Sequence, residues 1–176
     1  MQLHTYYTFT ISEHPDPALC YDYIRNNWHD LGQFAIDESL NSLKGFAEYF
    51  NASLDYSISI FPDRDEYITT EIDDIGISEL SGIRLFKYLT NNYDLDQLLS
   101  GNCPFTGMVY DESLLDEIRD FMEKPDSRTF QELLNDCTHK LLSALHADGD
   151  YIYSDEGLRE LCEANEYQFT ESGEFS

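Results

Sequence analysis

The stretch that decides the fold class is residues 53–71, which read SLDYSISIFPDRDEYITTE. Apolar and polar side chains alternate at its start, so that Leu54, Tyr56 and Ile58 share one face. This period of two is typical of a strand with one buried face. Pro62 and the charged residues after it have the composition of a turn, and the β-branched residues that follow favour an antiparallel return. The stretch therefore predicts a β-hairpin.

The residues before this hairpin predict one more strand and two helices. Residues 3–11 alternate in polarity as a strand does, and Asp16-Pro17 has the composition of a helix start. We expect a helix from there to about Trp28. A second helix is indicated by an apolar stripe at the helical period, namely Ile36, Leu40, Leu43, Ala47 and Phe50. Residues 1–76 thus predict the order β-α-α-β-β and a small antiparallel sheet of about three strands, packed with helices.

The remaining residues, 77–176, carry mostly helical patterns. Helices are expected at about 78–89, with Ser78 as the cap, and at 95–99, 112–123, 127–147 and after Ser154. The pattern after Asp126 is the strongest, and Asp148-Gly149-Asp150 is expected to end that helix. Residues 167–169 are expected to form a closing strand. Together the two parts predict an α+β fold in a single domain of residues 1–176, with a mostly helical C-terminal half.

The charge of the chain excludes several classes of function. Thirty-five acidic residues stand against ten basic ones, for a net charge of −25. Proteins that bind nucleic acids or anionic membranes need Lys and Arg to displace counterions from phosphate. We therefore expect no direct contact with nucleic acid and none with a membrane. Aromatic residues make up 14% of the chain, which argues against wholesale disorder.

The sequence carries no motif of catalysis or metal binding. It has no HExxH, no CxxC, no phosphate-binding glycine loop and no G-x-S-x-G. We therefore expect no enzyme, no catalytic residue, no metal site and no cofactor. A hydrolase with a divalent metal held by clustered acids is a weaker third hypothesis. The four cysteines are far apart and are expected to be free thiols, and the N-terminus lacks the pattern of a signal peptide, so a cytoplasmic location is expected.

The acidic residues are concentrated in three segments. Residues 53–74 carry a net charge of −6, residues 91–126 carry −7 and residues 148–176 carry −8. By contrast, residues 75–90 are at +1 and residues 127–147 are neutral, so we expect these two segments to be internal scaffold. Like charges four residues apart slightly destabilise a helix. Three such acidic segments suggest an external use, although solubility or a high-salt habitat is the plainer alternative.

The spacing of these acids matches that of a polyanion. Side chains at i and i+2 of a strand lie about 6.6 Å apart, and those at i and i+4 of a helix about 6 Å apart. Carboxylates at such intervals can occupy phosphate sites on a basic partner. The residues that we expect to bind the partner are Asp55, Asp63, Asp65, Glu66, Glu71, Asp73, Asp74, Glu112, Asp116, Asp120, Asp155, Glu156, Glu160 and Glu163.

Two resemblances point in the same direction. The loop GNCPFTG at residues 101–107, Asp111-Glu112, FQELL at 130–134 and the tail at 163–170 resemble small acidic proteins carried by bacterial phages and plasmids. That resemblance covers about half of the chain and implies no defined function. In size and charge the protein is similar to DNA-mimic inhibitors of restriction and CRISPR systems. The second resemblance is one of class, so no functional residue is carried over from it.

Two functional hypotheses follow from these observations. The first is a non-enzymatic acidic inhibitor that mimics nucleic acid and occupies the basic groove of a nucleic-acid-binding protein, such as a restriction or CRISPR complex of the bacterial host. The alternative is an antitoxin or adaptor-type module that neutralises a basic partner through apolar anchors such as Phe105, Met108 and Tyr110. In either case we expect a monomer or homodimer.

Overall fold

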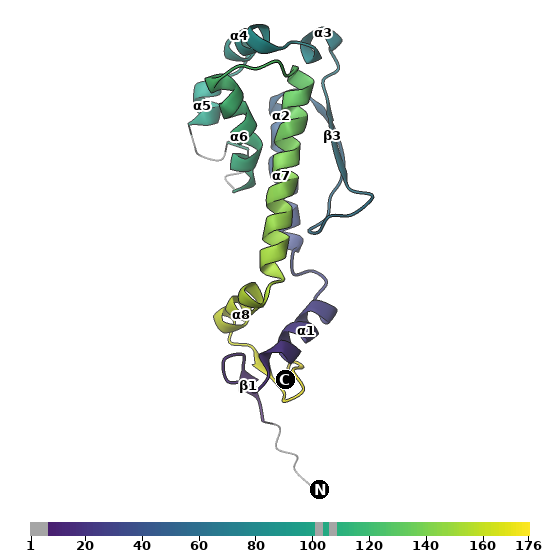
Figure 1. Ribbon diagram of the computed structural model, residues 1–176, viewed down its shortest axis with the longest axis vertical. Coiled ribbons are helices and arrows are strands. Elements are labelled where there is room, and N and C mark those ends of the chain that lie inside the picture. Colours follow the sequence, from purple (N-terminus) through teal and green to yellow (C-terminus); the bar gives the residue numbers. More distant parts are fainter. Residues whose placement is uncertain (1–6, 101–103, 106–108) are drawn as a thin grey trace. The chain divides into compact units, whose positions relative to one another are not determined.

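The computed structural model describes residues 7–100, 104–105 and 109–176 and has an α+β fold (Figure 1). In this part of the chain there are eight helices and two antiparallel sheets of two strands each. The α+β class and the helical C-terminal half are thereby confirmed. Contacts divide the chain into two compact units: unit 1 is residues 1–32 with 148–176, and unit 2 is residues 33–147. The expectation that residues 1–176 form a single domain stays a prediction.

Unit 1 is built from the two ends of the chain. Its elements are β1 (Phe9–Thr10), α1 (Pro17–Asn27), α8 (Asp155–Ala164), β4 (Gln168–Phe169) and the last residues of α7 (Phe130–Ile152). Strand β1 runs antiparallel to β4, with Phe9 opposite Phe169. Helix α1 starts at Pro17 as predicted, and Ser154 caps α8 by accepting a hydrogen bond from the N–H of Gly157.

The predicted sheet of about three strands is wrong in its pairing, although the strands themselves exist. Strand β1 pairs with β4, about 160 residues later in the chain, and does not join the hairpin. It is also shorter than expected within the described residues, because the chain turns at once: His14 donates its N–H to the carbonyl of Thr10. His14 is buried, and its Nε2 lies 2.9 Å from the carbonyl oxygen of Thr170. Local alternation predicts a strand but carries no information on its partner.

A small apolar core holds unit 1 together. Its buried members are Ile11, Cys20, Tyr21, Ile24, Leu158, Cys162 and Phe169. Aromatic rings close one end of this core, since the ring of Phe175 stacks on that of Phe169 with centroids 4.9 Å apart and lies 5.0 Å from that of Trp28. Gly173 permits this arrangement because its φ is +83° and a Cβ there would lie 2.7 Å from Leu19.

Unit 2 contains the hairpin and most of the helices. Its elements are α2 (Gln33–Tyr49), β2 (Ser53–Ser57), β3 (Tyr67–Glu71), α3 (Ile75–Ser78), α4 (Gly82–Asn92), α5 (Leu95–Leu99), α6 (Tyr110–Glu123) and α7 up to Ala147. In Figure 1, α6 lies on one side of α2 and α7 and the hairpin on the other. Strands β2 and β3 pair antiparallel, with Asp55 opposite Thr69, so the predicted hairpin is confirmed.

Two helix boundaries differ from the prediction. Ser78 does not cap a helix: it is the last residue of the short helix α3, whose N-cap is Asp74, and α4 begins after Ser81. Helix α7 also continues through Asp148-Gly149-Asp150 to Ile152. A glycine inside a helix costs only about 1 kcal/mol, which packing can offset, and Gly149 is buried. None of the helices in the described stretches is both long and apolar enough to cross a membrane.

The core of unit 2 lies where α2, α6 and α7 meet. Leu43, Phe46, Leu114 and Leu141 are fully buried there. The rings of Phe50 and Phe105 meet that of Phe46 edge-on, with centroids 5.0 Å and 5.8 Å away. Of the apolar stripe predicted on residues 36–50, Leu43, Ala47 and Phe50 are buried and Ile36 and Leu40 are half-buried, whereas the buried Phe46 was not part of the predicted stripe.

Candidate partner-binding surface

The predicted partner-binding acids are mostly exposed. Twelve of the fourteen are exposed, and Glu66 and Glu112 are half-buried. They belong to three sets. The hairpin set is Asp55, Asp63, Asp65, Glu66, Glu71, Asp73 and Asp74; the α6 row is Glu112, Asp116 and Asp120, which Glu123 extends; the α8 row is Glu156, Glu160 and Glu163, with Asp155 beside it.

The α8 row points directly away from the core of unit 1. The buried residues of α8, among them Leu158 and Cys162, lie on the opposite side of the helix from the three glutamates. Glu160 accepts a hydrogen bond of 2.6 Å from the hydroxyl of Tyr151, which raises the pKa of that tyrosine. Glu163 accepts one of 2.9 Å from the hydroxyl of Ser12. These bonds hold two carboxylates in place without neutralising them.

Asp155 lies beside the row and is partly neutralised. It forms an ion pair with Arg25 of α1, and Arg25 also contacts Asp22 at 3.4 Å. Arg159, the other basic residue of unit 1, is exposed and forms no ion pair within the described residues. The α8 row therefore forms no ion pair among the described residues, and Arg159 lies at its edge, three residues after Glu156 and four before Glu163.

The α6 row also faces solvent but is partly neutralised. Arg119 lies at its edge and contacts Glu112 at 2.6 Å and Asp116 at 3.2 Å. The hydrogen bond that Arg119 donates to Glu112 helps to raise the pKa of this arginine. Asp120 and Glu123 are exposed, and neither has an ion pair in the part of the chain that the structure describes. Within the described residues, Glu112 and Asp116 thus share the charge of Arg119, whereas Asp120 and Glu123 form no ion pair.

The hairpin set is divided between the two ends of the hairpin. Asp55 and Glu71 lie on its exposed face, together with Thr69 and Tyr67. Both carboxylate oxygens of Asp55 lie 3.2 Å from the Tyr67 hydroxyl, and the charge of Asp55 raises the pKa of that tyrosine. Asp63 and Asp65 are at the turn, with Arg64 between them. On the exposed face of β3, Tyr67 and Thr69 thus lie between Glu71 and the two aspartates of the turn.

Two acids of the hairpin set have structural roles in the fold. Asp74 caps α3 by accepting hydrogen bonds from the N–H groups of Gly76 and Ile77. Glu66 has a side chain that is only 8% exposed; it accepts a bond from the N–H of Ser59 and lies 3.0 Å from Nε2 of His146 on α7. Glu66 therefore fixes the end of the hairpin against α7.

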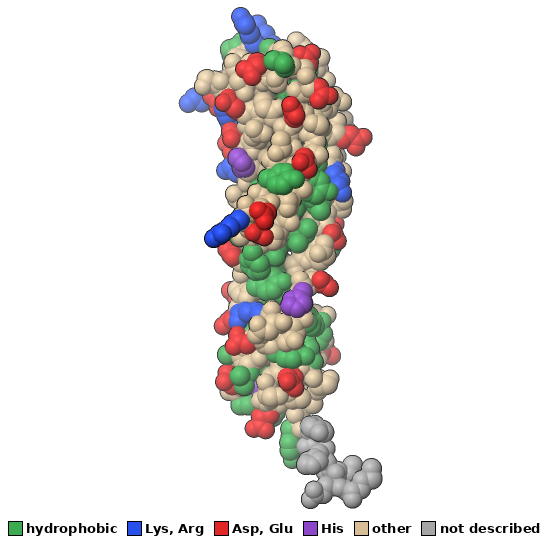
Figure 2. Space-filling view, turned by 90° about the vertical axis from the view of Figure 1, so that its right-hand side faces the viewer, with side chains coloured by type: hydrophobic (Ala, Val, Ile, Leu, Met, Phe, Trp, Pro, Cys, Tyr) green, Lys and Arg blue, Asp and Glu red, His purple; other side chains and the backbone are tan. Residues whose placement is uncertain are grey.

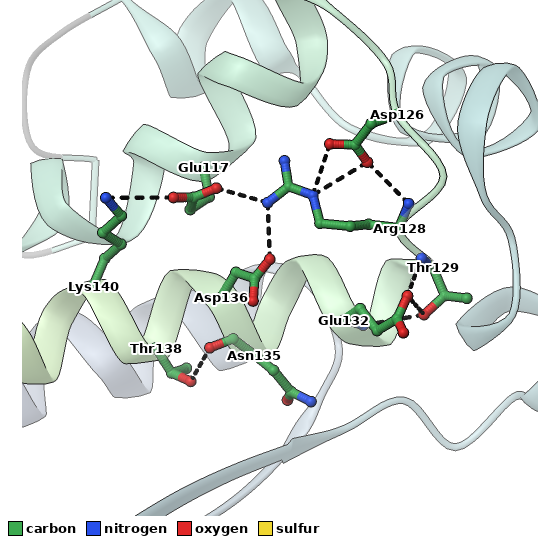
Figure 3. A network of polar contacts seen from close by, with 9 residues as sticks. All are labelled: Glu117, Asp126, Arg128, Thr129, Glu132, Asn135, Asp136, Thr138 and Lys140. Carbon is green, nitrogen blue, oxygen red and sulfur yellow. Dashed lines mark hydrogen bonds and ion pairs between the residues drawn. The ribbon is translucent and has the colours of Figure 1, made fainter.

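A further set of charges forms a network that the sequence did not indicate. Arg128 contacts Glu117 at 2.6 Å, Asp136 at 2.9 Å and Asp126 at 2.9 Å, and Lys140 lies 3.5 Å from Glu117 (Figure 3). We call these five residues the Arg128 network. The carboxylates raise the pKa of the guanidinium. Glu117 is 11 residues from Arg128 in the sequence, so only the packing of α6 on α7 brings them together.

The hairpin set and the α6 row of unit 2 do not form one continuous band. The α8 row belongs to unit 1, and the hairpin set and α6 row belong to unit 2, on opposite sides of α2 and α7 (Figure 1). On the face drawn in Figure 2, acidic side chains stand apart from one another, with apolar and neutral surface between them. A partner therefore meets the hairpin set and the α6 row separately.

The apolar anchors expected for the alternative function are not free. Tyr110 is 5% exposed, and the backbone N–H of Phe105 donates to the buried Asp111 at 2.7 Å. Gly45 admits Phe105, because a Cβ there would lie 2.7 Å from that of Phe105. Met108 lies outside the described residues. The large apolar side chains that are exposed in unit 2 include Ile75 and Ile83, which the sequence pattern did not single out.

Comparisons with known proteins identify no relative. No protein-family model matches the sequence, and neither a curated protein nor a solved structure is significantly similar to it. Among the described residues, no group of three or more His, Cys, Asp or Glu is arranged to hold a metal ion. The surface chemistry described above therefore has to carry any functional argument.

Proposed function

We propose that the protein is a non-enzymatic inhibitor that binds a basic, nucleic-acid-binding protein and occupies its phosphate sites with rows of carboxylates. The partner class that we favour is a host-defence protein, such as a restriction or CRISPR complex, in the cytoplasm of a bacterial host. The observation that carries the proposal is the α8 row: Glu156, Glu160 and Glu163 are exposed, share one helix face and form no ion pair within the described residues.

The regular spacing of this row supports mimicry of a nucleic-acid strand. Glu156 and Glu163 are seven residues apart, which is about 10.5 Å along a helix. Three carboxylates over that length lie about 5 Å apart along the helix axis, a regular spacing that is wider than the roughly 3.4 Å per phosphate along one strand of duplex DNA. The α6 row is less dense and loses charge to Arg119. The α8 row is therefore the better candidate for insertion into a basic groove.

Attraction between opposite charges would make the association fast and sensitive to salt. Electrostatic steering raises association rates and weakens as ionic strength rises. Unit 1 fits such a role, because thirteen of its residues are acidic and two are basic, and all thirteen acids are exposed.

The test is displacement of DNA by matched variants. Proteins that the wild-type chain retains from a bacterial lysate at low salt are eluted with a salt gradient, and each is then loaded with fluorescent duplex DNA. The triple variant E156Q/E160Q/E163Q should need at least tenfold more protein to displace the DNA. The control D30N/E171Q/E174Q changes the same number of exposed acids in the same unit and should shift displacement less than threefold.

Two results would overturn the proposal. If saturating wild-type protein leaves the DNA bound to every retained protein, the chain does not occupy a nucleic-acid site. If the row variant and the control lose the same amount of activity, net charge alone is responsible and the row has no special role.

The second candidate is an antitoxin or adaptor-type module that neutralises a basic partner through apolar contacts. Ile75 and Ile83 favour it, since they are 77% and 61% exposed on unit 2. In that case the affinity should change little between low and high salt, and I75S/I83S should abolish binding while E156Q/E160Q/E163Q leaves it intact.

A further inference from the structure

A groove runs between the outer edge of β3 and helix α7. Its volume is about 550 Å³. The residues that line it are Ile68, Thr69, Thr70, Glu71, Ile72, Asp73, Ile75, Ser78, Gln131, Asn135 and His139. One side is thus a continuous strand and the start of α3, and the other is a stripe of α7 at four-residue intervals. All of these residues belong to unit 2.

Polar side chains of α7 act as partners for part of this strand edge. The N–H of Ile72 donates to Oε1 of Gln131 at 3.1 Å, and Nε2 of Gln131 donates to the carbonyl of Thr70. The Thr70 hydroxyl donates to Oδ1 of Asn135 at 3.3 Å. Two residues of a strand and four of a helix advance by similar lengths, about 6.6 and 6 Å, which is why the two elements stay in step.

This pairing leaves one stretch of the edge open. Because Thr70 and Ile72 direct backbone groups toward Gln131, the alternation of an antiparallel pair directs the N–H and C=O of Ile68 to the same outer edge. No residue of the described chain outside the hairpin bonds to these groups. His139, the next member of the α7 stripe, is exposed and lines the groove there without bonding to the strand. An open strand edge is a template for pairing with another chain.

The surroundings of the open edge define the chemistry of an occupant. Glu71 and Asp73 are exposed at the rim, and neither side chain has a partner among the described residues. Ile75 continues the groove at its α3 end and is 77% exposed. In an added strand, side chains alternate between two faces. Those on the outer face would lie near Glu71, and those on the inner face near Ile68.

We infer that this groove takes an extended segment of the basic partner, which pairs with the open edge of β3 at Ile68 and continues along the rim of the groove, with Lys or Arg toward Glu71 and Asp73 and apolar side chains toward Ile68. Main-chain hydrogen bonds give affinity in this mode of recognition, and alternate side chains give specificity. The inference rests on the proposed function in taking the partner to be basic. It assigns the hairpin side of unit 2 a contact that differs from insertion of the α8 row.

The probe is a capped peptide of three Lys-Val repeats, titrated into the full-length protein at low salt. The shifts of backbone amide resonances should be largest at residues 68–73, and a peptide of three Glu-Val repeats should not bind. The Lys-Val peptide methylated on alternate backbone nitrogens keeps its charge but cannot pair with a strand, and it should bind at least tenfold more weakly.

Variants of the protein give the matching control. E71Q/D73N should weaken binding of the Lys-Val peptide at least fivefold. D120N/E123Q removes one Asp and one Glu, both exposed, from α6 on the other side of α2 and α7, and it should change binding less than twofold. Equal binding of the methylated and unmethylated peptides, or amide shifts confined to other residues, would overturn the inference.

The two proposals can fail separately. Peptide binding at the groove combined with no displacement of DNA overturns the proposed function alone. Displacement of DNA by a protein that does not bind the peptide at residues 68–73 overturns the groove alone.

Discussion

The two units of this protein use their acidic residues differently. Unit 1 has thirteen acidic and two basic residues among 61, and all of its acids are exposed. Unit 2 has twenty-two acidic and eight basic residues among 115, and some of its carboxylates are drawn inward. Glu117, for example, is only 17% exposed and holds Arg128 and Lys140 between α6 and α7. Acidity is therefore a surface property of unit 1, whereas in unit 2 it also contributes to packing.

The units also differ in what opposes the repulsion between their acids. Unit 1 has a small core of seven buried residues and two strands of two residues each. Small cores bury a smaller share of their surface and leave little stability to spare. Unit 2 has α2 of 17 residues, α6 of 14 residues and α7 up to Ala147 around a larger core. We expect unit 1 to be the less stable of the two, and the following experiments test that comparison.

The largest expected effect is the loss of unit 1 on truncation of its central ring. Phe169 is fully buried, and Phe169→Ala should cost about 3–5 kcal/mol. Hydrogen exchange should then show loss of protection in α1 and α8, with protection of α2 and α6 retained. The control is Phe130→Ala, a truncation of the same size in unit 2. If Phe169→Ala reduces protection equally in both units, the two units do not unfold separately.

Alkaline pH should also act on unit 1. Burial raises the pKa of the Cys20 and Cys162 thiols from 9 to about 11. The neutral thiols are favoured in the folded state, so this stability is fully present below pH 9 and is lost as pH rises through 11. Each thiol should contribute about 2–3 kcal/mol, since one pKa unit corresponds to about 1.4 kcal/mol.

Urea denaturation monitored through the Trp28 signal, at intervals from pH 8 to pH 11, measures this loss. In the double variant C20A/C162A, the free energy of unfolding should fall less steeply with pH. The fall that remains is due to tyrosines such as Tyr21, because burial also raises the pKa of that side chain. An unchanged slope would show that the thiols do not titrate within the folded unit.

A smaller effect is expected in unit 2 from removal of the guanidinium of the Arg128 network. Arg128→Ala leaves Glu117 with only Lys140 and should cost about 2 kcal/mol, the range for a hydrogen bond to a charged group. Thermal unfolding followed by circular dichroism measures it. Arg84→Ala, at an exposed residue of the same unit, should cost less than about 0.5 kcal/mol. A similar loss in both variants would mean that the network adds nothing beyond net charge.

The smallest effect concerns the helix that carries the α8 row. Ser154→Ala removes the cap that accepts from Gly157 and should cost about 1 kcal/mol. Ser154→Asp should restore the cap. Exchange of amides at the start of α8 is the measurement, and identical exchange in Ser154→Ala and the wild type would contradict a stabilising cap.

The rows of acids could be predicted from the sequence, but their surroundings could not. Glu156, Glu160 and Glu163 are at helical spacing, so their shared face follows from the period of the helix alone. Glu66 is in the same kind of acidic stretch as Asp65, yet its side chain is buried against His146, 80 residues away in the sequence. The partial neutralisation of Glu112 and Asp116 depends on where Arg119 points. Such contacts depend on geometry that composition does not encode.

The sequence by itself determined the α+β class, the hairpin, the position of most helices and the net charge of each segment. These properties depend on interactions between residues that are neighbours in the chain, and the periods of two and 3.6 express them directly. Only the tertiary structure decided that β1 pairs with β4, that α7 runs through Gly149, and which carboxylates are free. Each of these depends on which distant surfaces meet, because burial and pairing, rather than local propensity, set the free energy there.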